Sequence, residues 1–188
     1  MTDPLAVFQE WFEQARTAGV ATPEAMTLAT ADWDGRPSAR MLLLKGADER
    51  GFAFFSGYES RKGRELADNP RAALVFYWSP LGRQVRVEGT VRRLSREESD
   101  AYWATRPPRS RAAAAASRQS EPIESREALE AEFQAQLAAG AIARPERWGG
   151  YLLEPETIEL WQHRDDRLHE RILFTRAREG WREQRLSP

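Results

Sequence analysis

The N-terminal part of the chain carries apolar side chains at helical spacing. They recur every three or four positions from Leu5 to Ala15, which is the pattern of an amphipathic helix. Asp3 and Pro4 suit an N-cap and a first helical residue, and Gly19 suits a stop signal. We therefore predict a helix over this segment, with one face covering a hydrophobic core.

After residue 24 the pattern changes to short apolar or alternating runs separated by turn-forming residues. Such runs are typical of β-strands, and they occupy residues 25–32, 38–46, 52–57, 71–79, 83–95, 149–162, 170–177 and 181–187. Gly89 lies inside one run, where it indicates a bulge or a close backbone approach. Short turns imply antiparallel pairing, and this many short strands favours a small barrel.

Helices are predicted between these strands, over residues 60–70, 95–105 and 125–140. Ser60 is placed to cap the first, and Ser95 with Glu98 forms a capping box for the second. Residues 106–124 are predicted to be an irregular connection, because prolines bracket the alanine run there; a helix over the alanine run is the alternative. The predicted fold is mainly β with inserted helices (α+β), in a single domain over residues 1–188.

Composition excludes several classes of function. The chain has no cysteine, which excludes disulfides and thiolate metal sites, and His163 and His169 do not have a familiar metal-ligand spacing. A net charge of −1 argues against nucleic-acid binding. No apolar run approaches the ~20 residues that span a bilayer, and no signal-peptide pattern is visible. We expect a cytoplasmic protein without a metal site.

Two stretches place cations where a bound anion would stabilise them. Only Lys45 and Lys62 are lysines among the 28 cationic residues, so a compact charge is indicated at both; a coding bias toward arginine is the alternative. Arg61 and Lys62 sit at a helix start, where cations oppose the helix dipole unless a phosphate binds there. Arg40 and Lys45 are five positions apart, so a regular strand points them to opposite faces. Solvated helix and strand ends remain the alternatives.

Three other stretches concentrate hydrogen-bond donors. Tyr102, Arg106 and Ser110 are spaced by four and are predicted to converge at a helix end, where all three can bind phosphate. Gln84, Gln119 and Ser120 offer further donors at a strand start and in a loop. Ordinary exposed polar residues are the alternative for each of these stretches.

The stretch WQHRDDRLHER, residues 161–171, can also be either a ligand-binding segment or ordinary exposed surface. Arg167, His169 and Arg171 alternate, so an extended chain points them to one side. They would repel one another unless an anion or an aromatic plane lies there. The alternative is a plain hairpin tip.

Together these stretches resemble the pyridoxine (pyridoxamine) 5′-phosphate oxidase family. The matching pieces are DPLAVFQEW, RMLLLKG, FFSGYESRKGREL, NPRAALVFYW, RQVRVEG, YWATRP, SRQS, WGGY, IELWQ and RLHER through RLSP, in family order. The resemblance implies an antiparallel split β-barrel that forms a homodimer and binds FMN at the subunit interface. It implies oxidation of pyridoxine or pyridoxamine 5′-phosphate to pyridoxal 5′-phosphate, in vitamin B6 metabolism, with dioxygen as acceptor and hydrogen peroxide as product.

The resemblance also implies roles for individual residues. The implied cofactor contacts are Arg40, Met41, Leu42, Leu43, Leu44, Phe55, Ser56, Arg61, Lys62, Gln84, Gln119, Ser120, Trp161 and Arg171. The implied substrate contacts are Lys45, Tyr102, Arg106 and Ser110, together with Arg167 and His169 as the catalytic pair beside the substrate. Phe55 stands where the family usually has tyrosine.

Two alternatives stay open at this stage. One is a related FMN oxidase that acts on another reduced ring, such as a phenazine precursor. The other is a non-catalytic protein that binds flavin or pyridoxal phosphate.

Overall fold

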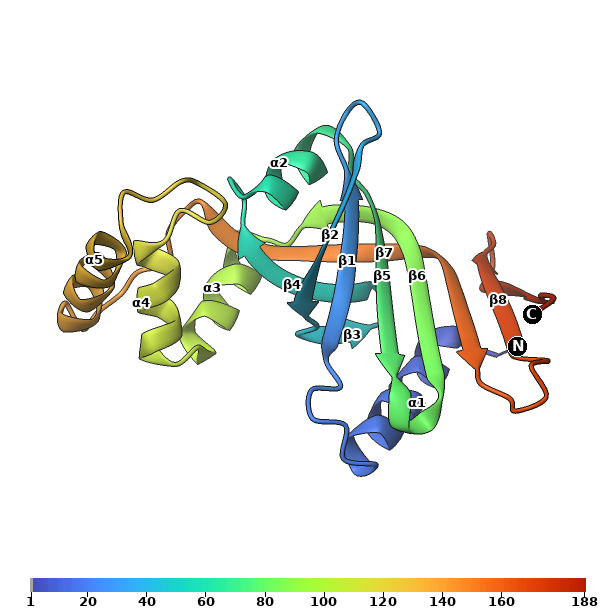
Figure 1. Ribbon diagram of the computed structural model, residues 1–188. Helices are drawn as coiled ribbons and strands as arrows, with labels where there is room; N and C mark the ends of the chain where they lie inside the picture. Colours follow the sequence, from blue (N-terminus) through green and yellow to red (C-terminus); the bar gives the residue numbers. More distant parts are fainter. Residues whose placement is uncertain (1) are drawn as a thin grey trace.

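The computed structural model describes residues 2–188, and its strands form one antiparallel sheet (Figure 1). The strands are β1 (Ala25–Ala31), β2 (Pro37–Leu43), β3 (Gly46–Asp48), β4 (Gly51–Gly57), β5 (Arg71–Trp78), β6 (Arg83–Arg93), β7 (Trp148–Gln162), β8 (Glu170–Arg176) and β9 (Trp181–Arg185). Their order in the described part is β2-β1-β5-β6-β7-β4-β3, with β8 paired to β7 and β9 to β8. The sheet curls into a split barrel, as predicted, and β2 and β3 are its two ends.

Strand β7 organises the molecule because it pairs with three neighbours. Its first half pairs with β4 from Trp148 to Leu153, and its second half pairs with β8 from Thr157 to Gln162. Strand β6 lies along both halves, with a register shift between Glu88 and Gly89 that confirms the predicted bulge. In Figure 1 β7 therefore crosses the molecule, from the cluster of α3, α4 and α5 at one end to β8 at the other.

The helices are α1 (Pro4–Thr17), α2 (Arg61–Asp68), α3 (Arg96–Thr105), α4 (Pro108–Ala116) and α5 (Arg126–Ala138), with a 3-10 turn at Ser79–Leu81. Their predicted caps are present: the side chain of Asp3 caps α1, that of Ser60 caps α2, and Ser95 with Glu98 forms a capping box for α3. Each cap satisfies backbone N–H groups that would otherwise lack an intrahelical partner.

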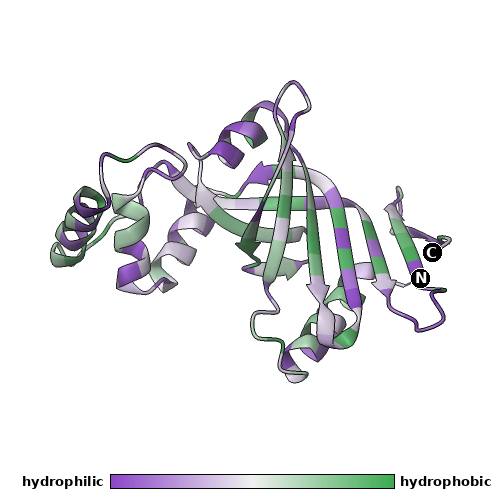
Figure 2. Ribbon diagram, in the orientation of Figure 1, coloured by the Kyte–Doolittle hydropathy of each residue, from purple (hydrophilic) through white to green (hydrophobic). Residues whose placement is uncertain are grey.

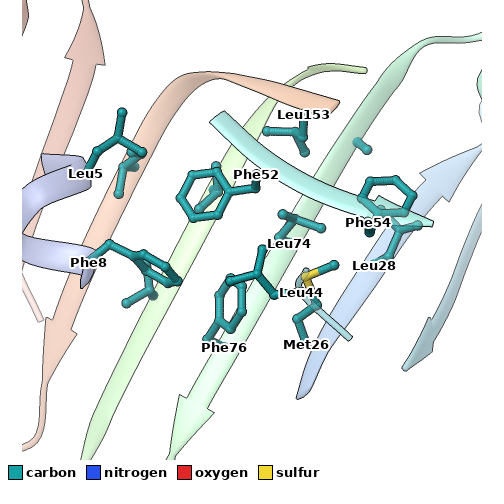
Figure 3. Close-up of a cluster of buried hydrophobic side chains, with 14 of the residues drawn as sticks. Leu5, Phe8, Met26, Leu28, Leu44, Phe52, Phe54, Leu74, Phe76 and Leu153 are labelled. Carbon is teal, nitrogen blue, oxygen red and sulfur yellow. The ribbon is translucent and has the colours of Figure 1, made fainter. Parts of the chain in front are cut away.

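The hydrophobic core lies on the concave face of the sheet, where α1 covers it. Buried residues alternate with more exposed ones along β1, β5 and β6, and on β6 this appears in Figure 2 as alternating hydrophobic and hydrophilic bands. Phe8 of α1 packs edge-on against Phe52 and Phe76, with ring centroids 4.9 and 5.0 Å away. Figure 3 shows this cluster together with Leu28 and Leu74 from neighbouring strands. Burying each such side chain contributes about 1.5–3 kcal/mol.

Two local predictions were wrong. Residues 106–124 are not an irregular connection throughout, because α4 forms within them. Pro108 is its first residue, where a missing N–H costs nothing, and the alanines after it are strong helix formers. The predicted strand over residues 38–46 is divided: β2 ends at Leu43, and Gly46 begins the short strand β3, which extends into the predicted turn and pairs with β4.

Candidate functional site

The side chain of Lys62, the second residue of α2, is 4% exposed. Its Nζ donates to three side-chain oxygens, those of Ser56, Ser60 and Gln119, each at 3.0 Å. All three acceptors are neutral, and no carboxylate within residues 2–188 pairs with this ammonium group. Burial, reinforced by the charge of Arg40, lowers the pKa of Lys62 to about 8. A buried cation held this way is ready for an anionic ligand.

Two segments distant in sequence meet at this ammonium group: residues 56–62 and Gln119. Ser60 caps the start of α2, and Ser56 lies near the end of β4. Gln119, after α4, accepts from Ser56 Oγ at 2.9 Å as well as from Lys62. Ser120 follows in a left-handed conformation, with φ of 74°. The predicted cofactor residues Ser56, Lys62 and Gln119 are thus brought together.

A buried carboxylate lies beside this group and was not predicted. Glu65 of α2 accepts from Arg61 Nε at 2.8 Å and from Arg40 Nη2 at 3.2 Å. It also accepts from the hydroxyls of Thr30 and Ser38. Its spacing of four residues from Arg61 on a predicted helix was the available signal. Nothing local indicated the contacts from β1 and β2.

An aromatic wall stands next to the Lys62 group. The rings of Phe55 and Tyr102 stack with centroids 3.8 Å apart, and Trp148 stacks on Phe55 at 5.7 Å. Gly150 on β7 allows this packing, because a Cβ there would lie 2.8 Å from the Phe55 ring. Burial raises the pKa of the Tyr102 hydroxyl, so at neutral pH it stays protonated and can donate a hydrogen bond.

Arg106 joins the aromatic wall to α4. Its guanidinium lies 4.5 Å from the centre of the Trp148 ring, and its Nη2 donates to the carbonyl oxygen of Ser110 at 2.8 Å. Arg106 is the C-cap of α3 and Ser110 lies in the first turn of α4. Arg106 and Ser110 are thus close together at the end of α3, but the contact is made by the backbone carbonyl of Ser110 and not by its hydroxyl. A cleft of about 860 Å³ is lined by Leu42, Phe55, Ser56, Arg106, Ser110 and Gln119, among others.

The run of residues 40–44 forms most of edge strand β2 and the residue after it. Met41 is 63% exposed and Leu43 is 41% exposed, on the convex face of the sheet. Leu42 lines the cleft and Leu44 is buried in the core. Lys45 follows with an exposed side chain, and its backbone N donates to Ala53 O at 2.8 Å. That bond places Lys45 beside Ala53 of β4, which is two positions before Phe55.

A second group of predicted residues lies on adjacent strands at the far end of β7. Gln84 of β6 is the cross-strand neighbour of Trp161 on β7, which in turn neighbours Arg171 on β8. Arg171 Nε donates to Glu159 Oε1 at 2.8 Å, and Arg86 Nη1 pairs with the same carboxylate at 3.3 Å. Glu159 is 7% exposed, so these pairs balance a buried charge.

The loop between β7 and β8 differs from the predicted extended chain. Arg167 has a φ of 65°, and β8 begins only at Glu170, so Arg167, His169 and Arg171 do not alternate on one strand. The reason is a turn: Asp166 Oδ1 accepts from the backbone N of Leu168 at 3.0 Å. His169 lies 4.8 Å from the Trp161 ring between centroids, while Arg167 is exposed.

The two groups lie at opposite ends of β7. Trp148 opens this strand beside the cleft and Trp161 lies next to its last residue. At about 3.3 Å per residue, the chain between them runs for roughly 40 Å. None of Gln84, Trp161 and Arg171 lines the cleft, so on a single chain the two groups are separate.

The cleft and its residues suit a phosphorylated, ring-containing cofactor. Arg61 and Lys62 at the start of α2 supply cationic and backbone donors for a phosphate. The aromatic wall and Leu42 supply apolar surface for a ring, and the cleft volume lies within the range of cofactor sites. Within residues 2–188 no group of three or more histidine, cysteine or acidic side chains is arranged to hold a metal ion. Nor is any helix in this range long and apolar enough to cross a membrane.

Comparison with protein families gives two matches that cover most of the chain. Residues 12–137 match a family described as pyridoxamine 5′-phosphate oxidase. Residues 148–188 match the pyridoxine 5′-phosphate oxidase C-terminal dimerisation region.

Two bacterial proteins that carry this family's name are similar to almost the whole chain. The pyridoxine/pyridoxamine 5′-phosphate oxidase of Rubrobacter xylanophilus is 58% identical over 99% of this chain and 87% of its own length. That of Paraburkholderia phymatum is also 58% identical, over 99% of this chain and 89% of its own.

Two solved structures share the fold. PhzG from Burkholderia lata, in complex with tetrahydrophenazine-1-carboxylic acid, has a TM-score of 0.97 and 38% identity, covering 100% of this chain and 94% of that one. A pyridoxamine 5′-phosphate oxidase-related, FMN-binding protein from Nostoc punctiforme has a TM-score of 0.79 and 19% identity, covering 96% and 97%.

Proposed function

The chain belongs to the pyridoxamine 5′-phosphate oxidase family, and we propose that it is an FMN-dependent oxidase of pyridoxine or pyridoxamine 5′-phosphate. The products are pyridoxal 5′-phosphate and hydrogen peroxide, with dioxygen as the acceptor; the amine substrate also consumes water and releases ammonia. The observation that carries the cofactor assignment is the buried ammonium group of Lys62, which has three neutral acceptors and, in the part of the chain that the structure describes, no carboxylate partner. A phosphate dianion supplies the missing charge.

The proposed cofactor site occupies the cleft between β4, α2 and α4. Arg40, Arg61 and Lys62 hold the phosphate of FMN, while Ser56, Gln119 and Ser120 donate to its polar groups. Residues 41–44 and Phe55 border the ring system. Three or four charge-assisted hydrogen bonds of about 1.5–3 kcal/mol each are of the order that micromolar affinity requires.

The proposed substrate site adjoins it at the aromatic wall. Tyr102 belongs to this wall, and Arg106 contacts Trp148 and the carbonyl oxygen of Ser110. Lys45 lies beside Ala53 of β4. These four residues bind the phosphate of the substrate. Bound FMN supplies the hydride acceptor for the 4′ carbon of the substrate. The protein's part is to hold the substrate in position, with Arg167 over the pyridine ring and His169 beside a polar substituent.

We propose that the complete site forms between two copies of the chain. The second group, with Gln84, Trp161 and Arg171, does not line the cleft of its own chain. The cross-strand register puts these three side chains on the sheet face that also carries exposed Met41 and Tyr77. A second copy packed on this face buries the apolar side chains and brings its own Trp161 and Arg171 to the cleft. The match of residues 148–188 to a dimerisation region supports this arrangement.

A mixing experiment tests the shared site. Lys62→Ala and Arg171→Ala chains are each expected to bind FMN weakly as homodimers. Unfolding and refolding them together produces heterodimers in which one site has both residues intact, so half of their sites recover binding. No recovery in dimers shown to be mixed would mean that each site belongs to one chain.

The activity test is direct. The purified protein is expected to be yellow, with a flavin absorbance spectrum, and to convert both phosphorylated substrates to pyridoxal 5′-phosphate with uptake of oxygen. A flavin-loaded protein that forms no product from either substrate refutes the oxidase assignment. Tight binding of pyridoxal phosphate without turnover would instead identify a non-catalytic binder.

A second candidate is a flavin oxidase of a reduced phenazine precursor. It is favoured by the likeness to PhzG, which holds tetrahydrophenazine-1-carboxylic acid. The presence of Lys45, Tyr102, Arg106 and Ser110 as a set argues against it, because a phenazine carboxylic acid has no phosphate for them to bind. Competing the two substrate classes in one assay with Arg106→Ala separates the candidates. Only oxidation of the phosphorylated substrate should depend on Arg106.

We also propose that residues 1–188 act as one FMN-binding domain. Both family matches fall on the same continuous sheet, because β4 and β6, within the first match, pair directly with β7 in the second.

A further inference from the structure

We propose that Glu65 is a positioning residue for the phosphate end of the cofactor site, where it holds the side chains of Arg40 and Arg61 in place before FMN arrives. This inference rests on the proposed FMN site. Glu65 would not contact the phosphate itself. It would act through the two arginines, and mainly through Arg61.

Glu65 gathers donors from three elements onto one carboxylate. Its Oε2 accepts from Thr30 Oγ1 on β1, at 2.5 Å, and from Arg40 Nη2 on β2, at 3.2 Å. Its Oε1 accepts from Arg61 Nε on α2 at 2.8 Å, and Ser38 Oγ approaches both oxygens at 2.7 and 2.9 Å. The carboxylate therefore links the start of α2 to the edge of the sheet.

The hydrogen bond from Arg61 to Glu65 uses only one of the nitrogens of the guanidinium group. The side chain of Arg61 is 63% exposed, so a free arginine at this position would sample many rotamers. The bond through Nε fixes the stem and leaves Nη1 and Nη2 without a partner among the residues that the structure describes. Those two groups carry the donors that suit a phosphate.

Arg40 is held differently. Nη1 donates to Leu28 O and Thr30 Oγ1, and Nη2 donates to Ser38 Oγ and Glu65. Only Nε of this guanidinium remains free within the described chain. Arg40 therefore offers mainly its charge, whereas Arg61 offers directed hydrogen bonds.

Burying a carboxylate costs free energy through desolvation, and other interactions must offset that cost. Burial by itself raises the pKa of Glu65, but the hydrogen bonds from Thr30, Ser38, Arg61 and Arg40 outweigh it and lower the pKa to about 2. An ionised acid this close to a phosphate site also repels the ligand. Glu65 therefore favours FMN binding only if the free energy gained by holding the two arginines in place exceeds this repulsion.

These two effects predict opposite results for Glu65→Ala. If Glu65 acted only through its charge, removing it would tighten FMN binding. If it positions the arginines, FMN must order them itself when it binds to Glu65→Ala, and this loss of side-chain freedom opposes binding. We expect FMN binding to weaken by about tenfold, and Glu65→Gln to lie between Glu65→Ala and the wild type.

Titration of flavin fluorescence with FMN and with riboflavin provides the test, and riboflavin is the internal control because it lacks the phosphate. Glu65→Ala is expected to weaken FMN while leaving riboflavin within about twofold. Asp68→Asn is the matched control, since Asp68 is an exposed acid on the same helix. It is expected to change neither ligand. Thermal unfolding of each variant checks the fold.

A double-mutant cycle with Arg61→Ala decides the route. If Glu65 acts through Arg61, the loss caused by Glu65→Ala largely disappears in the Arg61→Ala background. Unchanged or tighter FMN binding by both Glu65 variants overturns the proposal. Equal weakening of FMN and riboflavin also overturns it, because Glu65 would then only hold the fold. A wild-type protein that does not bind FMN would instead refute the proposed function.

Discussion

Replacing Lys62 with alanine should weaken FMN binding and remove its dependence on pH. The ammonium group is buried, and its three hydrogen-bond acceptors are neutral. A charge-assisted hydrogen bond to phosphate is worth about 1.5–3 kcal/mol. The dissociation constant of FMN for Lys62→Ala should therefore rise about 10- to 100-fold. Affinity for the substrate, measured with saturating FMN, should change much less.

The pH dependence follows from the pKa of Lys62, which burial lowers from its ordinary value of 10.5 to about 8 in the ligand-free protein. A bound phosphate favours the ammonium form and raises this pKa again. Above pH 8, binding must then take up a proton. The affinity of the wild type for FMN should fall between pH 8 and 9 by about fivefold, whereas that of Lys62→Ala should stay nearly flat.

The same shift has a consequence for the stability of the ligand-free protein. The folded-state pKa lies below the unfolded one, so below pH 8 both states are protonated and the burial penalty is fully present. Between about pH 8 and 10.5 the folded state releases its proton first, and Lys62 becomes less destabilising as the pH rises. Lys62→Met should therefore stabilise the ligand-free protein at pH 7.

Fluorescence titration with FMN at pH 7, 8 and 9 measures these effects. Arg64→Ala is the control, because Arg64 is an exposed cation on the same helix and should leave FMN affinity and its pH profile unchanged. Wild-type affinity that is constant from pH 7 to 9 would refute the reasoning. So would a loss in Arg64→Ala as large as that in Lys62→Ala, because net charge would then explain the result.

Three further predictions concern other parts of the molecule. Arg106→Ala should raise the KM for the phosphorylated substrate about 10- to 100-fold in steady-state assays; expulsion of the flavin would contradict the division into two phosphate sites. Gly89→Ala should destabilise the fold by about 2 kcal/mol or more in urea unfolding, since its Cβ would lie 2.1 Å from the carbonyl oxygen of Glu154. Tyr77→Glu should shift sedimentation from dimer to monomer, as it puts a charge on the face proposed to bind the second copy; an unchanged dimer would place the interface elsewhere.

Local physical rules were enough to predict much of this fold from the sequence. The helix caps at Asp3, Ser60 and Ser95 depend on side chains within a few residues of the N–H groups they satisfy. Strand positions follow from alternation, and the bulge at Gly89 follows from the missing side chain. The family resemblance also rested on short stretches in order along the chain, and the comparisons confirmed it.

The failures came where local signals compete. Prolines and alanines argue in opposite directions at residues 106–124, and the position of Pro108 at the first helical turn decided for α4. Arg167 alternates with His169 in sequence, but the side chain of Asp166 bends the backbone before β8 begins. Spacing alone does not reveal which of two local preferences is stronger.

Only the tertiary structure could place the site. Glu65 shares its carboxylate among β1, β2 and α2, and Gln119 reaches Lys62 from 57 positions away in sequence. Trp161 lies away from the cleft that contains Ser56 and Gln119, and only the path of β7 through the sheet shows this. Hydrogen bonds within a turn or helix depend on neighbours in sequence, whereas contacts between elements depend on strand order and register. Those are set by packing the whole core, and no short stretch of sequence contains them.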